Sequence, residues 1–378
     1  MASCGFCKAS KDQLKSCVCK KVSYCSKECQ AKDWKTHKPE CPPFILKESP
    51  GKGKGLFATR KIKEGQIISD EYPLVTMATP AGGGYNSIEF KINIYPFIDD
   101  ETKAKILELH DPAENFRTLD TRTIEELIRK QPHMVLLKEA EMDEVTKMFR
   151  IFCGNHTKFC IQKELYPEDD GGLYYNISRL NHSCVPNSTQ SWVMGDFSRR
   201  QVRALKIIEK DEEIVGSYKG KSDFIYGNRQ TRRQQLLELD AFLCSCSECS
   251  LQGKDLQDNE KMRADLRKKT GEIPSLALQL LTGAPASLPR RFMKKALKLS
   301  QQRLTLVKKL DLQAQYVYEL MNFYHVALDG KRMGISSEED PDVYKDNALK
   351  YAKLYGDTYI YGCSLFLDKV EGRGSSQK

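Results

Sequence analysis

Residues 179–188 read RLNHSCVPNS and place an asparagine, a histidine and a cysteine within four positions. The interpretation of the chain depends on the role of Cys184, because this thiol is a candidate metal ligand, core residue or nucleophile. A cysteine nucleophile needs an imidazole within hydrogen-bonding reach, and His182 is the neighbour that offers one. Pro186 and the polar residues around it predict an irregular turn, which does not favour that pairing.

Three further cysteines follow in the segment CSCSEC, with the spacing Cys244-x-Cys246-x2-Cys249. They have no fourth ligand beside them in the sequence, and a closed structural zinc site needs four. Cys184 can supply the missing ligand. We therefore expect a zinc site made of Cys184, Cys244, Cys246 and Cys249, and keep a core thiol and a nucleophile as alternatives for Cys184.

The first 41 residues carry a denser set of soft and imidazole ligands, namely Cys4, Cys7, Cys17, Cys19, Cys25, Cys29, His37 and Cys41. Eight such ligands suit two tetrahedral zinc ions. A segment of about forty residues buries too little apolar surface to fold unaided. Metal binding is therefore expected to supply most of its folding free energy.

Composition and charge limit the class of function. The chain has 378 residues, of which 40% are hydrophobic and 29% charged, as in a soluble globular protein of several domains. It lacks a signal-peptide pattern and a run of 18 apolar residues, which predicts no membrane contact and a reducing compartment. In such a compartment we expect the 14 cysteines to be ligands or core residues rather than disulfides.

The N-terminal end is basic: residues 1–63 contain 15 Lys/Arg against 5 Asp/Glu. Two zinc ions bound by seven thiolates would lower that surplus to about +7. No recognition-helix pattern accompanies it. We expect at most weak, non-specific binding to nucleic acid.

Residues 48–75, ESPGKGKGLFATRKIKEGQIISDEYPLV, combine alternating glycines with a strand pattern. The glycines allow a backbone to approach a ligand closely. The run does not fit a Walker A motif and is a poor dinucleotide fingerprint, so alone it indicates only a glycine-rich hairpin. It is followed by GGLYYNISRLNHSCVPN and VRALKIIEKDEEIVGSY within residues 171–218, and then by CSCSEC.

This order of motifs, with the finger sequence YCSKECQAKDWKTHKPEC at 24–41 in front, resembles the SET and MYND domain (SMYD) family of protein-lysine methyltransferases. The finger precedes the SET domain, which is more similar to the arthropod branch of the family. The resemblance implies an α+β fold of four parts: a zinc-bound MYND finger at 1–43, a β-rich SET domain at 44–243 with a helical insertion at about 86–150, a zinc-bound post-SET loop at 244–252, and an all-α, TPR-like domain at 253–378.

Helical periodicity agrees with two of these parts. ETKAKILELH, TRTIEELIRK and EAEMDEVTKMFRIF, within residues 99–152, have apolar positions three or four apart. Two further stripes in the C-terminal part predict helices that each bury one face: Met293, Leu297, Ser300, Leu304 and Val307 in one, and Leu312, Tyr316, Leu320, Phe323 and Ala327 in the other.

The resemblance also implies the site residues. One finger zinc would take Cys4, Cys7, Cys25 and Cys29, and the other Cys17, Cys19, His37 and Cys41, although one residue separates Cys17 from Cys19 where the family usually has two. The post-SET cysteines would join Cys184 to hold their loop over the active site. The cofactor S-adenosylmethionine would be held by Lys52, Gly53, Lys54, Asn181, His182, Tyr218 and Phe242.

Tyr218 is the implied catalytic residue, because a tyrosine hydroxyl orients a lysine amine without carrying a charge at neutral pH. Asp240 stands where vertebrate relatives carry a second channel tyrosine. A carboxylate about 4 Å from the substrate amine would favour its protonated form by roughly 4 kcal/mol. We expect that either Asp240 points away and a tyrosine such as Tyr226 closes the channel, or methyl transfer is weak or narrowly selective.

Two functions follow as hypotheses. The first is methylation of lysine in histones or other proteins by a monomeric enzyme of the cytoplasm and nucleus. The alternative is a non-catalytic adapter or transcriptional co-regulator whose finger binds proline-rich peptides.

Overall fold

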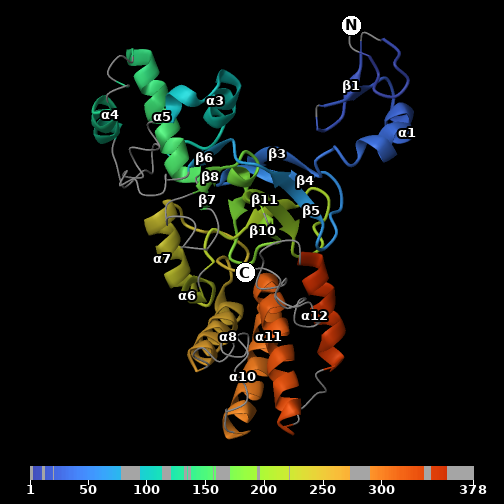
Figure 1. Cartoon of the computed structure of the whole chain (residues 1–378), viewed down its shortest axis with the longest axis vertical. Coiled ribbons are helices and arrows are strands. Elements are labelled where there is room, and N and C mark those ends of the chain that lie inside the picture. The colour runs from blue at the N-terminus through green and yellow to red at the C-terminus, as the bar shows by residue number, and fades with distance from the viewer. Residues whose placement is uncertain are drawn as a thin grey trace.

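The structure is a computed structural model, and it describes residues 3–10, 13–19, 21–77, 94–112, 121–131, 134, 138–155, 157–158, 171–193, 196–220, 222–272, 290–335 and 342–355. Figure 1 shows an N-terminal finger set apart from a central group of strands, with one group of helices on the opposite side and another group below. The mixture of helix and small sheets is the α+β class that the sequence predicts.

The N-terminal finger consists of a short hairpin and one helix: β1 (Lys15–Ser16), β2 (Ser23–Tyr24) and α1 (Lys27–His37). Helix α1 begins after Ser26, whose hydroxyl accepts a hydrogen bond from the Cys29 N–H. The buried cluster of the finger is made of Tyr24 and three of the ligand cysteines, with Trp34 packed against it. The apolar core is therefore very small.

The central part folds as three small sheets, with the strand orders β3-β4-β12-β9, β10-β11-β5 and β6-β8-β7. Their strands are β3 (Phe44–Ser49), β4 (Gly53–Ala58), β5 (Ile67–Glu71), β6 (Val75–Met77), β7 (Thr157–Lys158), β8 (Gly171–Leu173), β9 (Asn181–His182), β10 (Ser188–Val193), β11 (Asp196–Ala204) and β12 (Glu213–Gly216). Leu56, Ile62, Tyr174, Val202 and Ile214 belong to the buried core that the first two sheets share.

The strand register of the first sheet positions the motifs found in the sequence. Strand β12 pairs antiparallel with β4, which carries the glycine run, and parallel with β9, so that Val215 faces Asn181 and Gly216 faces His182. Tyr218 lies two residues after the end of β12. The glycine run, the NHSC segment and the SY segment therefore meet at one edge of a sheet although they are distant in sequence.

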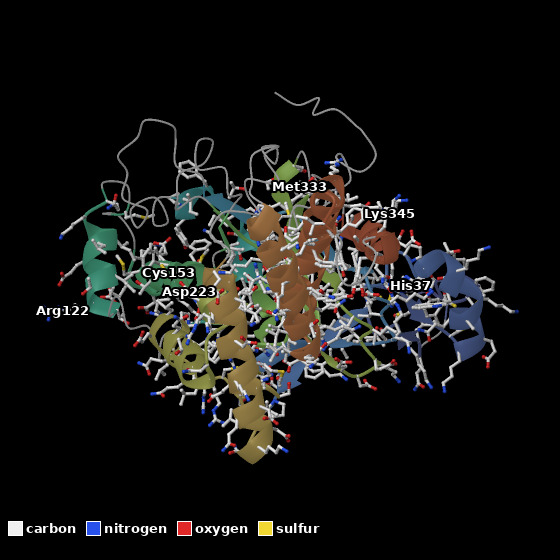
Figure 2. All side chains as sticks on the ribbon, turned by 90° about the horizontal axis from the view of Figure 1, so that it is seen from below. His37, Arg122, Cys153, Asp223, Met333 and Lys345 are labelled. Carbon is white, nitrogen blue, oxygen red and sulfur yellow. The ribbon has the colours of Figure 1, made fainter. Side chains whose placement is uncertain are left out.

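A helical layer lies beside the sheets, on the side away from the finger (Figure 1). It contains the short helix η1 (Tyr95–Phe97) and the helices α3 (Asp100–Leu107), α4 (Thr121–Arg129) and α5 (Glu139–Asn155). Ile106, Ile124, Ile128 and Phe149 are fully buried in its core. The three helices predicted within residues 99–152 are therefore confirmed. Figure 2, seen from below, places Arg122 of α4 and His37 of the finger on opposite sides of the molecule.

The remaining described elements are helices, of which η3 lies among the strands: η3 (Ile177–Arg179), α6 (Ser222–Ile225), α7 (Arg229–Asp240), α8 (Gly253–Gly271), α10 (Arg290–Lys309), α11 (Gln313–Arg332) and α12 (Asp342–Tyr355). The first predicted stripe is buried throughout, and the second is buried except for the half-buried Tyr316. Helix α12 packs against the sheets, where the Tyr355 hydroxyl donates to Ala204 O at 3.1 Å. Among the residues placed by the structure, none of the helices has the length and apolarity of a bilayer span.

Candidate active site and metal centres

Three groups of thiol and imidazole side chains gather candidate ligand atoms within 4.8 Å of one another. The first finger site is Cys4, Cys7, Cys25 and Cys29; the second finger site is Cys17, Cys19, His37 and Cys41; the four-cysteine site is Cys184, Cys244, Cys246 and Cys249. The groups are the three sets expected from the sequence.

The spacing within each group fits a tetrahedral zinc ion. With zinc–sulfur bonds of about 2.3 Å, two ligand sulfurs lie about 3.8 Å apart. The Sγ atoms of Cys7 and Cys25 are 3.6 Å apart and those of Cys17 and Cys41 are 3.7 Å apart. Cys19 Sγ lies 3.2 Å from His37 Nε2, so the shortened spacing after Cys17 still brings both cysteines into the second finger site. The donor sets therefore fit three zinc ions.

Cys184 lies in the four-cysteine site and not in an isolated cysteine–histidine pair. Its Sγ atom is 3.7 Å from Cys249 Sγ and 3.6 Å from His182 Nε2, and the thiol is buried. The loop that carries Cys244, Cys246 and Cys249 joins α7 to α8. Four buried thiols in this arrangement favour a metal ligand over a nucleophile for Cys184.

The Glu213 carboxylate organises the edge where the glycine run meets β9. Its Oε1 atom accepts hydrogen bonds from Ser49 Oγ at 2.8 Å and Asn181 Nδ2 at 2.7 Å, and its Oε2 atom is 2.9 Å from Lys52 Nζ. Burial raises the pKa of this carboxyl, but the three donors outweigh burial and hold the pKa below its usual value. Asn181 Nδ2 also donates to Lys54 O at 3.2 Å.

Two glycines of the run have different structural requirements. Gly53 has a φ of +73°, and a Cβ atom added there would meet nothing within 4 Å. Gly55 has no such space, because a Cβ atom would lie 2.5 Å from Glu213 Oε1 and 2.7 Å from Asn181 Nδ2. Gly55 therefore permits the close approach of β4 to Asn181, while Gly53 borders open space.

His182 fixes the position of Tyr218. The buried imidazole accepts a hydrogen bond from the Tyr218 backbone N–H through Nδ1 at 3.0 Å, and burial lowers the pKa of His182 to about 4, so the ring is neutral at physiological pH. The Tyr218 hydroxyl donates to Leu180 O at 2.9 Å. The rings of His182, Tyr218 and Phe242 form a cluster with centroid distances of 5.2 to 6.0 Å.

Tyr218 remains 43% exposed although its hydroxyl is hydrogen-bonded to Leu180 O. Burial raises the pKa of the Tyr218 hydroxyl, and the negative charges of Asp240 and Glu213 raise it further. The hydroxyl therefore stays protonated at neutral pH. An aromatic side chain with an exposed surface and an uncharged hydroxyl is suited to contact a ligand.

Asp240 does not carry an unbalanced charge beside Tyr218. Its carboxylate oxygens lie 2.9 and 2.8 Å from Lys219 Nζ, and both side chains are 23% exposed. Tyr226, the alternative channel tyrosine, is buried in a different cluster with Leu266 and Val307. The sequence interpretation missed Lys219 as the partner of Asp240.

Glu213 was also missed, although it lies within the motif DEEIVGSY that supported the resemblance. The signal that would have found it is its place at the start of the strand that pairs with the glycine run. An acidic residue there can meet the lysines of that run.

Two family models match the chain: the SET domain model over residues 53–219 and the MYND finger model over residues 4–41. N-lysine methyltransferase SMYD2 of Sus scrofa is 25% identical over 336 residues, which are 88% of this chain and 69% of the relative. Histone-lysine N-methyltransferase ASHR1 of Arabidopsis thaliana is 28% identical over 69% of this chain and 50% of its own length. Human histone-lysine N-methyltransferase SMYD3 is 26% identical over 72% of this chain and 58% of its own length.

Among solved structures, the SET domain of LSMT bound to lysine and AdoHcy matches with a TM-score of 0.32 at 12% identity, covering 90% of this chain and 91% of that one. This likeness is too distant to bear on function. The family models, together with the sheet edge and the three ligand groups, define a SET-domain protein with a zinc finger before the SET domain. The chain belongs to the SET and MYND domain family of protein-lysine methyltransferases.

Proposed function

We propose that this chain transfers a methyl group from S-adenosylmethionine to a lysine of a protein substrate, in histones or other proteins. The observation that carries the proposal is the position of Tyr218. Its backbone is fixed by His182, its hydroxyl by Leu180 O, and its ring is exposed beside Phe242 at the edge formed by the glycine run. The relatives named above as lysine methyltransferases support the same conclusion.

The residues at this edge fit the cofactor chemically. Lys52 supplies a cation for a carboxylate, and Glu213 and Lys54 O supply acceptors for an amino group. Gly53 leaves open space beside the backbone. Phe242 and Tyr218 supply aromatic surface for a purine. We propose that Lys52, Gly53, Lys54, Asn181, His182, Tyr218 and Phe242 bind the cofactor.

When bound, S-adenosylmethionine supplies a methyl group on a positively charged sulfur. The acceptor lysine must be neutral to attack, although its usual pKa is about 10.4. Tyr218 is suited to orient this amine because its hydroxyl carries no charge at neutral pH and does not favour the ammonium form. The remaining contribution is proximity, since donor and acceptor atoms must be held in line.

Lys219 reduces the difficulty that Asp240 would create. An isolated carboxylate near the acceptor would stabilise its ammonium form, whereas the Lys219–Asp240 pair is neutral as a whole. We propose that the pair lets methyl transfer proceed in spite of Asp240. The rate remains sensitive to both residues.

The test is radiolabelled methyl transfer to histones and to cell extract by the wild type, Tyr218→Phe and the control Tyr72→Phe. Tyr72 is exposed, and its hydroxyl donates to Asp196 at 2.7 Å. We expect Tyr218→Phe to lose on the order of 100-fold in rate with retained cofactor binding by calorimetry, and Tyr72→Phe to behave as the wild type. A wild type that binds no S-adenosylmethionine would overturn the proposal.

A second function is favoured by the finger surface. Phe6 is 43% exposed and Val18 is 53% exposed, so the finger presents apolar side chains to solvent. We propose that this surface binds proline-rich peptides, either to recruit substrates or, if methyl transfer is absent, as the main activity of an adapter or transcriptional co-regulator. The test is titration of a proline-rich peptide into the wild type and into Phe6→Ser. We expect the wild type to bind the peptide and Phe6→Ser to bind it more weakly.

We propose a monomer of the cytoplasm and nucleus, with at most weak, non-specific nucleic-acid binding. None of the cysteines that the structure describes forms a disulfide, which supports a reducing compartment. We also propose domain boundaries at 1–43, 44–243, 244–252 and 253–378, with the insertion at about 86–150.

A further inference from the structure

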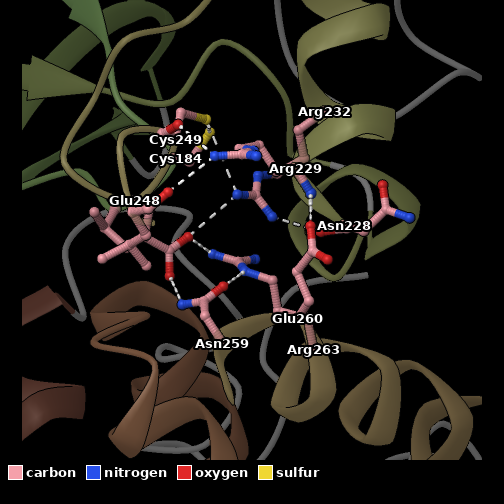
Figure 3. Close-up of polar contacts among 12 residues, drawn as sticks. Cys184, Asn228, Arg229, Arg232, Glu248, Cys249, Asn259, Glu260 and Arg263 are labelled. Atoms are coloured by element: carbon pink, nitrogen blue, oxygen red, sulfur yellow. Dashed lines mark hydrogen bonds and ion pairs between the residues drawn. The ribbon is translucent and has the colours of Figure 1, made fainter. Parts of the chain in front are cut away.

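A cluster of charged side chains lies behind the four-cysteine site (Figure 3). Glu248 stands between two of the cysteine ligands in the sequence, Arg232 comes from α7, and Arg263 comes from α8. Glu248 is 7% exposed, Arg232 1% and Arg263 0%. Charged groups this deeply buried are costly unless they are paired.

The two guanidinium groups share one carboxylate oxygen. Glu248 Oε2 forms an ion pair with Arg263 Nη2 and lies 3.5 Å from Arg232 Nη2. Glu248 Oε1 accepts a hydrogen bond from Asn259 Nδ2 at 2.6 Å. Arg232 Nη2 also lies 4.0 Å from Cys249 Sγ, so the cluster reaches the ligand itself.

The cluster also connects three segments of backbone. Arg232 Nη1 donates to Gly227 O at 2.5 Å, and Arg263 Nη1 donates to Ile225 O at the end of α6. Near the same site, Arg229 Nη1 donates to Leu251 O at 2.9 Å, just before α8 begins. The zinc-binding loop, α6–α7 and α8 are therefore joined by the buried Arg232 and Arg263 and by the half-buried Arg229.

Both buried arginines have anionic partners only when the cysteines bind zinc as thiolates. Arg232, Arg263 and Glu248 together carry one excess positive charge in a buried place. A zinc ion held by four thiolates carries a net charge of −2. The two arginines, with a charge of +2, then face the metal centre and the carboxylate, with a combined charge of −3, so that neither guanidinium lacks an anionic partner.

We propose that Arg232 and Arg263 are positioning residues for the zinc-binding loop: they neutralise the tetrathiolate centre and fasten it to α8, so that the four-cysteine site and the first helix of the C-terminal part form one cooperative unit. This inference concerns the metal centre and does not depend on methyl transfer. We therefore expect α8 to lose order when the zinc ion is removed, and the zinc ion to leave faster when its contacts with α8 are lost.

Zinc release from the full chain tests the proposal. A chromogenic chelator is mixed with the wild type, Arg263→Met, Arg263→Lys and Arg267→Met, and the rate of zinc release is measured. The kinetic phase that is missing in Cys184→Ser is the release of zinc from the four-cysteine site. Arg267 lies one turn further along α8 and is exposed, so it is the matched control. We expect that zinc to leave roughly 10-fold faster or more in Arg263→Met, because a buried hydrogen-bonded charge is lost.

We expect intermediate release in Arg263→Lys, which keeps the charge, and wild-type release in Arg267→Met and from both finger sites. Equal rates of zinc release in Arg263→Met and Arg263→Lys would mean that the charge of Arg263 does not contribute to zinc retention. Equally faster release of all three zinc ions would mean that the variant unfolds generally. Either result overturns the proposal. If Arg263→Met does not fold, hydrogen exchange of Cys184→Ser tests whether α8 is ordered by the metal. Amides of 253–271 should lose protection while those of 313–332 keep it, and retained protection in α8 would refute the inference.

Discussion

The finger sites and the four-cysteine site use the same ligand chemistry in opposite surroundings. In the finger, Cys7 is exposed and the buried cluster consists of ligand cysteines and Tyr24. In the four-cysteine site all four thiols are buried, and they pack with Phe224 and Leu236 in front of a buried charged cluster. The difference teaches that zinc replaces a core in the finger, whereas in the SET region it ties a loop onto a core that already exists.

Complete metal removal should separate the two regions most clearly. We expect a strong chelator to unfold residues 3–41 and to leave the sheets and α10–α11 folded, because two zinc sites contribute on the order of 10 kcal/mol each to a segment without its own core. Hydrogen exchange of the metal-free chain measures this. A finger that keeps its protected amides without metal would contradict the comparison.

Variants that remove one zinc ligand compare the four-cysteine site with the first finger site in their effect on cofactor binding. Cys184→Ser should release one zinc and free the loop next to Phe242, whose ring packs against His182 and Tyr218. We expect the affinity for S-adenosylmethionine to fall about 10-fold, which corresponds to the loss of an aromatic contact. Cys25→Ser in the first finger site is the matched control.

Calorimetric titration of both variants gives the result. Cys25→Ser should also release one zinc but should bind the cofactor as the wild type does, because the first finger site makes no described contact with Phe242 or His182. Equal losses of affinity in both variants would show that the finger and the cofactor site are coupled.

The ligand residues and the helical stripes could be predicted from spacing in the sequence, whereas the division of the eight finger ligands into two sets came from the family resemblance. Met293 and Val307, for example, follow a helical period and are fully buried. The partners of charged residues could not be predicted in this way. Lys219 meets Asp240 across 21 positions and Lys52 meets Glu213 across 161, and such contacts depend on the strand register and on the packing of α7, which no local pattern specifies.

Electrostatic balance near Tyr218 gives a smaller effect on rate. Lys219→Met leaves the Asp240 carboxylate unpaired, which favours the protonated acceptor lysine and raises its pKa. We expect methyl transfer at pH 7 to slow by roughly 3- to 10-fold, after screening by solvent, and the pH–rate curve to move to higher pH.

The double variant Lys219→Met, Asp240→Asn should restore most of the rate, because the unbalanced charge is removed. Lys61→Met is the control, since Lys61 and Glu209 form an ion pair of 2.6 Å that is more than half exposed and should contribute little. Rates that are unchanged in Lys219→Met would place Asp240 outside the path of the acceptor.

The smallest effect is expected at the joint between the finger and the sheets. The Arg60 guanidinium lies 5.2 Å from the Trp34 ring, and its Nη2 donates to Cys41 O at 2.8 Å. Arg60→Ala removes a cation–π contact and the hydrogen bonds to Cys41 O and Pro42 O, which we expect to cost the finger about 1 kcal/mol. Hydrogen exchange of residues 24–41 should increase slightly, with three zinc ions still bound. Cofactor affinity should stay at the wild-type value, because the four-cysteine site holds its loop through Arg232 and Arg263 without help from the finger. A loss of cofactor affinity as large as in Cys184→Ser would instead show that the finger supports the active site through Arg60.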